Sequence, residues 1–321
     1  SMPFLHVSKE HQHARTRTRT RTRTRMLFAP VHRLLGTHQN VGREFAKRGV
    51  VAFVPSYRLT TPGLPQLMLD HTLVASLVVG LAAIFIEPLR SWVTVLATVS
   101  LAYVTTLARR WVNPGVQHPS HCEDAAMAVA WVHKHAHEFG ADPERITIVG
   151  HSAGSHLAMM LCVCPSFLRD ANGPQAKTLH GVMAMSGPYC AEIMARSWLL
   201  RTLYLYPVFG NHPTAWHRMF PVGILRDCSA EELKNIRLPP TLIVNVEKDW
   251  GLEEHAPELE ETLLRTGDRA SVRVERRLVD GLNHFNSMTG VGKRGHRANV
   301  LIDIAVEWAT QDREAKYARL R

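Results

Sequence analysis

The sequence predicts an α/β fold in which a mostly parallel sheet carries helices on both faces. Two observations support this prediction. Short runs of β-branched and other apolar residues have the length of buried strands, and helical segments separate them along the chain. Strands that alternate with helices are typical of parallel sheets, because each parallel connection needs a crossover. With 321 residues, the chain is long enough for one large domain of this kind.

The expected elements follow in order from Val41. A helix that ends before Gly49 leads into a strand over Val50–Val54, and a second helix ends at Gly140. A buried strand is expected in "RITIVG", followed by an apolar helix over Ser155–Cys164. Further strands are expected in "HGVMAMSG", "PTLIVNV" and "SVRVERRLV", and a terminal helix in "RANVLIDIAVEWATQDREAKYARL".

The strongly positive charge comes largely from one segment. The net charge is +10, but six arginines lie in "RTRTRTRTRTR", Arg15–Arg25, and without them it is +4. The repeat lacks apolar residues and interleaved aromatics, so it cannot bury a core. We therefore expect residues 1–26 to form a disordered low-complexity tail, and we expect no specific nucleic-acid partner.

Cysteine and histidine usage argues against covalent cross-links and metal sites. The five cysteines are odd in number and include no CxxC pair, which favours a reducing compartment over a disulfide framework. His133 and His137 have the helical i, i+4 spacing of metal ligands, with His135 between them. No cysteine or acid completes such a site nearby, so we expect an exposed polar face and no metal.

Two uncharged runs interrupt the alternation of strands and helices. They are Thr72–Ile86 and Ser91–Ala108, joined by Glu87–Arg90, and they predict a helical hairpin over residues 67–111. Neither run has a polar face, which favours a membrane-associated, transmembrane hairpin; the alternative is a buried pair of helices that caps the domain. The α/β domain is then expected over 27–66 and 112–312, with a C-terminal tail over 313–321.

The segment "ITIVGHSAGSHL" has the pattern of a nucleophile elbow, a sharp turn from a strand to a helix that presents a serine. Residues beside the serine must lack bulk, which explains Gly150 and Gly154. His151 is expected to pack or to face the substrate. Ser152 is then a candidate nucleophile, and the backbone N–H of Ala153 is a candidate donor to an oxyanion.

A serine nucleophile needs a base and an orienting carboxylate, in the chain order Ser, acid, His. Asp249 lies just past the expected strand "PTLIVNV", where the acid should sit, and Glu247 is its rival. His284 follows another strand in "LVDGLNHFN", which makes it the candidate base among the 19 histidines.

The segments "REFAKRGVVAFVPSYRL", "FGADPERITIVGHSAGSHLA", "VNVEKDW" and "GLNHFN" resemble the α/β-hydrolase superfamily, from about Val41 to about Thr310. Among its branches, they are similar to the group of carboxylesterases, kynurenine-formamidase-like and prenylcysteine-methylesterase-like enzymes. The resemblance implies the triad Ser152, Asp249 and His284. The family's His-Gly-Gly segment, which supplies oxyanion donors, has no counterpart in Met26–Gly36, and the Arg-Thr repeat stands where opening strands are expected. We therefore expect missing opening strands and weakened activity.

These observations together predict a membrane-associated serine ester hydrolase that uses no metal or organic cofactor. Its substrate is expected to be a small-molecule or lipid-like ester, and a prenylcysteine methyl ester is one candidate. Arginines at both ends of the hairpin region place the catalytic domain on the cytoplasmic side of an intracellular membrane. A formamidase or amidase with the same triad, and a catalytically weakened hydrolase-fold protein that binds a lipid or partner, remain alternatives.

Overall fold

A computed structural model describes most of the chain, and it contains two compact units. Unit 1 comprises Ser1–Tyr57, His121–Ile193 and His217–Arg321, and unit 2 comprises Arg58–Ser120 and Met194–Trp216. The described residues are 5–7, 23–28, 37–60, 72–76, 78–79, 92–109, 116–236, 238–265 and 273–311.

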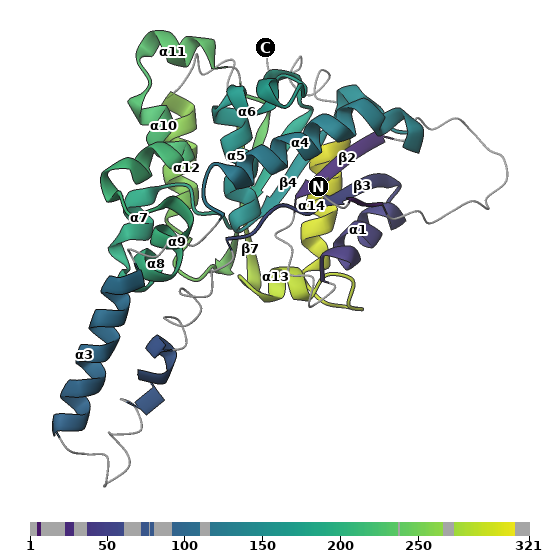
Figure 1. Cartoon of the computed structure of the whole chain (residues 1–321). Coiled ribbons are helices and arrows are strands. Elements are labelled where there is room, and N and C mark those ends of the chain that lie inside the picture. Colours follow the sequence, from purple (N-terminus) through teal and green to yellow (C-terminus); the bar gives the residue numbers. More distant parts are fainter. Residues whose placement is uncertain are drawn as a thin grey trace. The chain divides into compact units, whose positions relative to one another are not determined.

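Unit 1 contains a seven-stranded sheet with the order β1-β3-β2-β4-β5-β6-β7. Figure 1 labels β2, β3, β4 and β7 of this sheet. All neighbouring strands pair in parallel except β1 and β3, which pair antiparallel. The strands are β1 (Leu5–Val7), β2 (Arg23–Phe28), β3 (Val50–Pro55), β4 (Thr147–His151), β5 (Gly181–Met185), β6 (Thr241–Lys248) and β7 (Val274–Asn283). The prediction of a mostly parallel α/β sheet is therefore confirmed.

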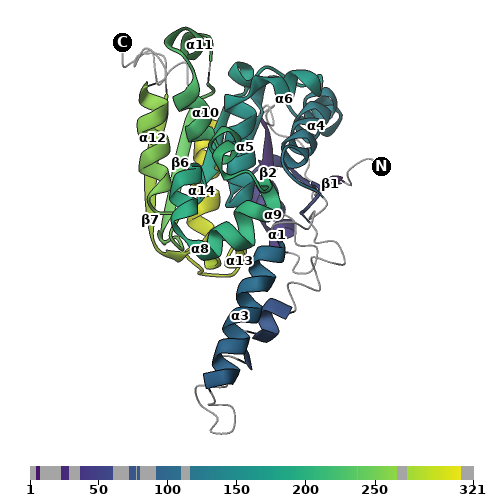
Figure 2. The same ribbon diagram turned by 60° about the vertical axis from the view of Figure 1, so that its left-hand side comes forward.

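Alternating side chains of the central strands pack into two cores on opposite faces of the sheet, because successive residues of a strand point to opposite faces. In β4, Ile148 packs into one core and Val149 into the other; in β5, Val182 and Met183 divide in the same way. The first core is covered by α4 (Ser120–His135), α5 (Ala153–Val163), α10 (Pro221–Asp227) and α12 (His255–Arg265), and the second by α1 (Thr37–Lys47) and α14 (Asn299–Thr310) (Figure 2).

Short helices complete the connections of unit 1. They are α6 (Pro165–Asp170), α11 (Ala230–Asn235), α13 (Asn286–Thr289) and 3-10 turns at Ala136–Phe139, Pro143–Arg145 and Ala176–Thr178. A capping box holds the first turn of α11, because Ser229 and Glu232 bond each other's backbone N–H groups. The terminal helix is shorter than expected, since α14 ends at Thr310, and the expected tail over 313–321 lies outside the described residues.

The N-terminal segment differs from the prediction. Disorder over 1–26 is wrong for Leu5–Val7 and for Arg23–Met26, which lie in β1 and β2; residues 1–4 and 8–22 lie outside the described residues. β2 pairs with β3 and β4 on its two sides, so the opening strands are present. The prediction from composition neglected that a neighbouring strand, here β3, can satisfy backbone polar groups of the repeat, and that threonine favours strands.

Unit 2 contains the helix α3 (Trp92–Arg109), which covers almost all of the second predicted apolar run. Residues 72–76 and 78–79 are also helical, whereas the rest of the first run and the joint at Glu87–Arg90 lie outside the described residues. Within the parts of the chain that the structure describes, none of the helices combines the length and the apolar character that crossing a bilayer requires. The predicted hairpin is thus not established.

The second segment of unit 2 consists of short helical turns. They are α8 (Trp198–Leu200), a π-helix (Arg201–Leu205) and α9 (Tyr206–Phe209); α7 (Ala191–Arg196) and a 3-10 helix (Pro213–Met219) lie where the chain passes between the two units. The His118 N–H donates to the Val208 carbonyl at 2.9 Å, and the Gln117 amide donates to the Pro207 carbonyl at 3.1 Å. These bonds join the two segments of unit 2.

Candidate active site

The turn between β4 and α5 holds Ser152 in a strained conformation. Its φ is +55°, which is uncommon for a residue with a β-carbon, and its N–H donates to the Met185 carbonyl at 2.9 Å. A β-carbon at Gly150 would lie 2.3 Å from the carbonyl oxygen of Gly154, so only glycine fits at position 150. The strand and the helix approach each other this closely because the turn is so sharp.

The structure brings together the three residues that the sequence singled out. The Ser152 Oγ lies 3.0 Å from the His284 Nε2, and the His284 Nδ1 lies 2.9 Å from the Asp249 Oδ1. All three follow strands of unit 1: Ser152 follows β4, Asp249 follows β6 and His284 follows β7. They meet because carboxyl ends of neighbouring parallel strands lie at one edge of a sheet.

Asp249 is fully buried, and its surroundings favour the ionised form. Burial by itself raises the pKa of this carboxyl, but hydrogen bonds from His284 and Asn245 outweigh that effect and leave the pKa below its usual value. The Asn245 Nδ2 donates to the Asp249 Oδ2 at 2.7 Å, and the Asp249 N–H donates to the Glu253 Oε1 at 2.8 Å. Both carboxylate oxygens therefore have a partner.

Glu247, the rival acid, has a different role. Its Oε2 accepts a hydrogen bond from the Gly281 N–H at 2.7 Å and links β6 to β7 where the register between the two strands shifts. The side chain is exposed, whereas Asp249 is buried against His284. The geometry thus favours Asp249 over Glu247 as the partner of the imidazole.

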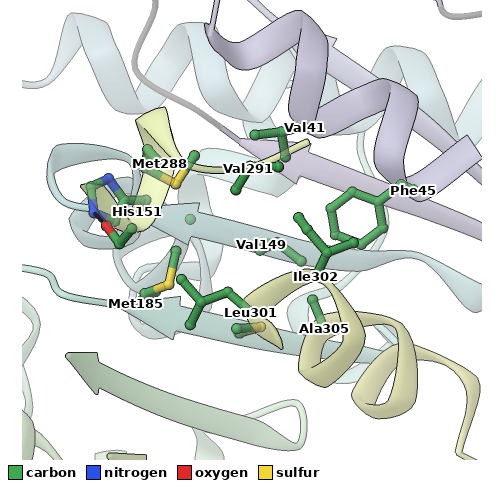
Figure 3. Close-up of a pocket in the computed structure, with 13 residues that line it drawn as sticks. Val41, Phe45, Val149, His151, Met185, Met288, Val291, Leu301, Ile302 and Ala305 are labelled. Carbon is green, nitrogen blue, oxygen red and sulfur yellow. Dashed lines mark hydrogen bonds between the residues drawn. The ribbon is translucent and has the colours of Figure 1, made fainter. Parts of the chain in front are cut away.

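Behind His284 lies a second histidine from the elbow. The His151 ring is 4.8 Å from the His284 ring between centroids, at an angle of 36°. The Ser287 Oγ donates to the His284 carbonyl at 2.7 Å and lies 3.3 Å from the His151 Nε2. His151 borders a small apolar cavity of about 20 Å³ between the sheet, α1 and α14, with Met288 beside it (Figure 3). Its side chain is buried, so of the two expected roles packing fits.

Ala153 is the expected backbone donor to the oxyanion. Ala153 is the first residue of α5, so its N–H has no acceptor one turn earlier in the helix. Residues 29–36, most of the stretch in which the family's Gly-Gly segment was sought, lie outside the described residues.

The other candidate groups of the sequence do not join this site. The His135 Nδ1 pairs with the Glu138 carboxylate at 2.8 Å, and the His133 Nε2 lies 3.7 Å from that of Glu144. Among the described residues, no three His, Cys, Asp or Glu side chains are grouped as a metal site requires. Burial raises the pKa of Cys162 to about 12 and of Cys164 to about 11, which keeps both thiols protonated at neutral pH.

Sequence reasoning missed three residues beside the triad: Asn245, Trp250 and Phe285. The sequence did contain a signal for Asn245, because a polar residue between apolar neighbours in a buried strand needs a hydrogen-bond partner. Trp250 and Phe285 directly follow the acid and the base, and both are largely exposed. Sequence spacing could not show that their rings meet.

The fold and this arrangement define a class: an α/β protein that presents a Ser-His-Asp array at the carboxyl edge of its sheet. Comparison with known proteins makes the class specific. Residues 111–285 match a protein family described as the alpha/beta hydrolase fold, and the chain belongs to that family.

Curated relatives are esterases or probable esterases by name. "Probable isoprenylcysteine alpha-carbonyl methylesterase ICMEL1" of Arabidopsis thaliana is 26% identical over 204 residues, 60% of this chain and 41% of the relative. "Esterase LipQ" of Mycobacterium tuberculosis is 37% identical over 62 residues, 19% of this chain and 15% of the relative. The matched part of the chain thus spans at most about two fifths of either relative.

Solved structures share the fold at low identity. An esterase from Pseudomonas putida superposes with a TM-score of 0.58 at 14% identity, covering 94% of this chain and 80% of that chain. Esterase B from a Lactobacillus superposes with a TM-score of 0.60 at 12% identity, covering 97% and 88%. At such identities the likeness establishes the fold.

Proposed function

We propose that this protein is a serine ester hydrolase of the carboxylesterase type. Ser152 is its nucleophile, His284 its general base and acid, and Asp249 the carboxylate that orients the imidazole. The observation that carries the proposal is the continuous contact from the Ser152 Oγ through His284 to the buried Asp249, at 3.0 and 2.9 Å. Such a relay makes a weakly acidic hydroxyl nucleophilic.

The reaction proceeds through an acyl-enzyme. The Ser152 Oγ attacks the ester carbonyl carbon while its proton passes to the His284 Nε2, and the carbonyl oxygen becomes an oxyanion that the Ala153 N–H stabilises. His284 then gives the proton to the departing alcohol oxygen as the C–O bond breaks. Water repeats the sequence on the acyl-enzyme and releases the carboxylic acid. The Asp249 carboxylate accepts a hydrogen bond from the His284 Nδ1–H and stabilises the imidazolium that forms in both steps.

The proposed substrates are lipid-like esters. The name of the Arabidopsis relative favours methyl esters of isoprenylated cysteine as one candidate. One alternative is a formamidase or amidase, which would use the same three residues. The other is a catalytically weakened protein of the hydrolase fold that binds a ligand, and the absence of Gly-Gly in Met26–Gly36 favours it. Hydrolysis of matched ester and formamide substrates separates these candidates, because the binding protein would hydrolyse neither.

We propose in addition that unit 2 associates with an intracellular membrane, with the triad on the cytoplasmic side. Exposed apolar side chains on α3, among them Trp92, Leu96 and Tyr103, support a lipid contact. Arg58 and Arg110 flank the apolar region in the sequence, as cytoplasmic flanks of membrane segments do.

Reaction with a fluorophosphonate probe tests the enzymatic proposal. The probe phosphonylates an activated serine and releases fluoride, so the wild-type protein should be labelled at Ser152 and lose ester turnover in proportion. Failure of the folded protein to react would overturn the assignment.

A further inference from the structure

The turn after the candidate acid carries an unexpected residue. Leu252 N–H donates to the Asp249 carbonyl at 3.1 Å, which closes a four-residue turn around Trp250 and Gly251. The φ angles of these two central residues are +58° and +80°, as in a type I′ turn. Asn, Asp and Gly are favoured at the first central position, because a β-carbon is strained there. A tryptophan at this position is therefore conformationally costly.

Core packing does not compensate for this strain. Trp250 is 64% exposed, and Phe285, which follows the candidate base, is 60% exposed. The two rings meet at 5.2 Å between centroids with an angle of 59°. They also contact the His284 ring, at 6.2 Å from Trp250 and 5.6 Å from Phe285. Two large aromatic side chains are thus held beside the catalytic imidazole with much of their surface open.

Their position identifies the part of a substrate that they can touch. During acylation the His284 Nε2 must come within hydrogen-bond distance of the leaving oxygen, because it protonates that oxygen. The acyl group, in contrast, stays bonded to the Ser152 Oγ. Groups attached to the leaving oxygen therefore pass beside His284 and the two rings.

We propose that Trp250 and Phe285 form an aromatic wall that binds the alcohol part of the ester and selects bulky, uncharged apolar alcohols over methanol. This inference rests on the proposed serine esterase activity and narrows its substrates, because it disfavours the methyl esters named above and favours esters of larger apolar alcohols. An apolar group on the wall removes ring surface from water, and an aromatic one adds ring–ring contact. Glu253, which caps the Asp249 N–H in the same turn, disfavours an anionic alcohol group.

A two-way set of esters tests the wall. One series keeps acetyl and varies the alcohol through methyl, butyl and benzyl; the other keeps methyl and lengthens the acyl chain. The measured quantity is kcat/KM, which reports the steps through acylation and therefore includes the alcohol. For Trp250→Asn we expect kcat/KM to fall about tenfold on benzyl acetate, which is equivalent to about 1.4 kcal/mol of transition-state stabilisation. On methyl acetate kcat/KM should fall less than about twofold, because methanol is too small to cover the rings.

Matched variants separate recognition from folding. Trp250→Asn should unfold at the same temperature as the wild type or higher, because asparagine suits the turn. Trp250→Phe should retain most of the benzyl preference, and Phe285→Ala should lose it. Leu278→Ala removes an exposed apolar side chain from the middle of β7 and should leave every ester unchanged.

Three outcomes would overturn the wall: an equal loss on all alcohols, a loss that follows acyl length, or a preference of the wild type for methyl esters. Choline acetate against its neutral isostere 3,3-dimethylbutyl acetate tests the chemistry, because a strong choline preference would mean a cation site instead. Failure of the proposed esterase looks different, since the wild type would then hydrolyse no ester of either series, or Ser152→Ala would keep the turnover of every ester.

Discussion

The two units differ in how far their apolar side chains are buried. In unit 1, Ile148, Met159 and Trp308 are fully buried against the sheet. In unit 2, Trp92 is 81% exposed and Leu96 is 64% exposed on α3. Apolar burial in unit 1 stabilises the fold that holds the triad, whereas the apolar surface of α3 remains available to another phase or partner. Substitutions at the triad in unit 1 should therefore change the rate of ester hydrolysis, and substitutions on α3 should change membrane binding.

The largest expected effect lies at the hydroxyl of the triad. Ser152→Ala should abolish fluorophosphonate labelling and lower kcat by a factor on the order of 10⁶, the size of effect known for triad serines. Thermal unfolding should change little, because only one oxygen is removed. Labelling that persists in this variant would mean that another residue is the nucleophile. A variant of α3 serves as the contrast, since it should label normally.

The next effect distinguishes the two candidate acids. Asp249→Asn should lower kcat about 10⁴-fold, because the imidazolium of the transition state loses its carboxylate. Glu247→Gln, which keeps an acceptor for the Gly281 N–H, should cost far less. Steady-state kinetics of both variants on one ester measures the ranking, and the reverse order would assign the acid to Glu247.

The apolar surface of α3 gives the third prediction. A variant with serine at Leu96, Val99 and Tyr103, all largely exposed, should bind anionic lipid vesicles at least about tenfold more weakly, given roughly 0.8 kcal/mol per CH₂ removed. Vesicle sedimentation measures the bound fraction. Its control is Leu278→Ser, an equally exposed apolar position in unit 1. Unchanged sedimentation of the triple variant, or absence of wild-type binding, would refute the membrane contact.

A smaller effect is expected at Asn245. Its Oδ1 is buried and has no hydrogen-bond partner in the described part of the chain, but its Nδ2 donates to the buried Asp249 carboxylate. Asn245→Leu should therefore destabilise the fold by about 1–3 kcal/mol, because a buried charged acceptor loses a donor. The variant loses the donor to the Asp249 Oδ2, which should reduce kcat/KM about tenfold, as expected for a hydrogen bond to a charged group. It should also raise the pKa of Asp249, because the carboxylate loses a hydrogen bond that favours its ionised form, and NMR titration of the carboxyl measures this change. An unchanged pKa of Asp249 would leave Asn245 with a packing role alone.

The smallest effect concerns stability and pH. Because the pKa of Asp249 is lowered in the folded protein, its ionisation stabilises the fold above the ordinary carboxyl pKa of about 4. This contribution should disappear as the pH falls from about 4 through the lowered pKa. Urea unfolding at several pH values should therefore show a steeper acid loss for the wild type than for Asp249→Asn. Parallel curves would mean that Asp249 is not preferentially ionised in the folded state.

Local patterns predicted much of unit 1. The strands around Ile148, Val182 and Ile243 were readable because parallel strands buried on both faces are continuously apolar. The elbow could be predicted because its sharp turn requires glycine at position 150, which leaves a recognisable pattern in the sequence. Chain order then selected Asp249 and His284 for positions that the structure brings into contact. For unit 2, the helical character of Trp92–Arg109 followed from the apolar run, but its surroundings did not.

The sequence by itself determined the parallel α/β fold and the three candidate residues, because backbone sterics and strand burial act on neighbours in the chain. Only the tertiary structure decided which long-range partners meet. It paired Arg23–Arg25 of a polar repeat with β3, which supplies backbone hydrogen bonds. It separated Asp249 from Glu247 by burial, and it brought Trp250 and Phe285 together beside His284. Such contacts depend on the packing of segments far apart in sequence, which no local pattern encodes.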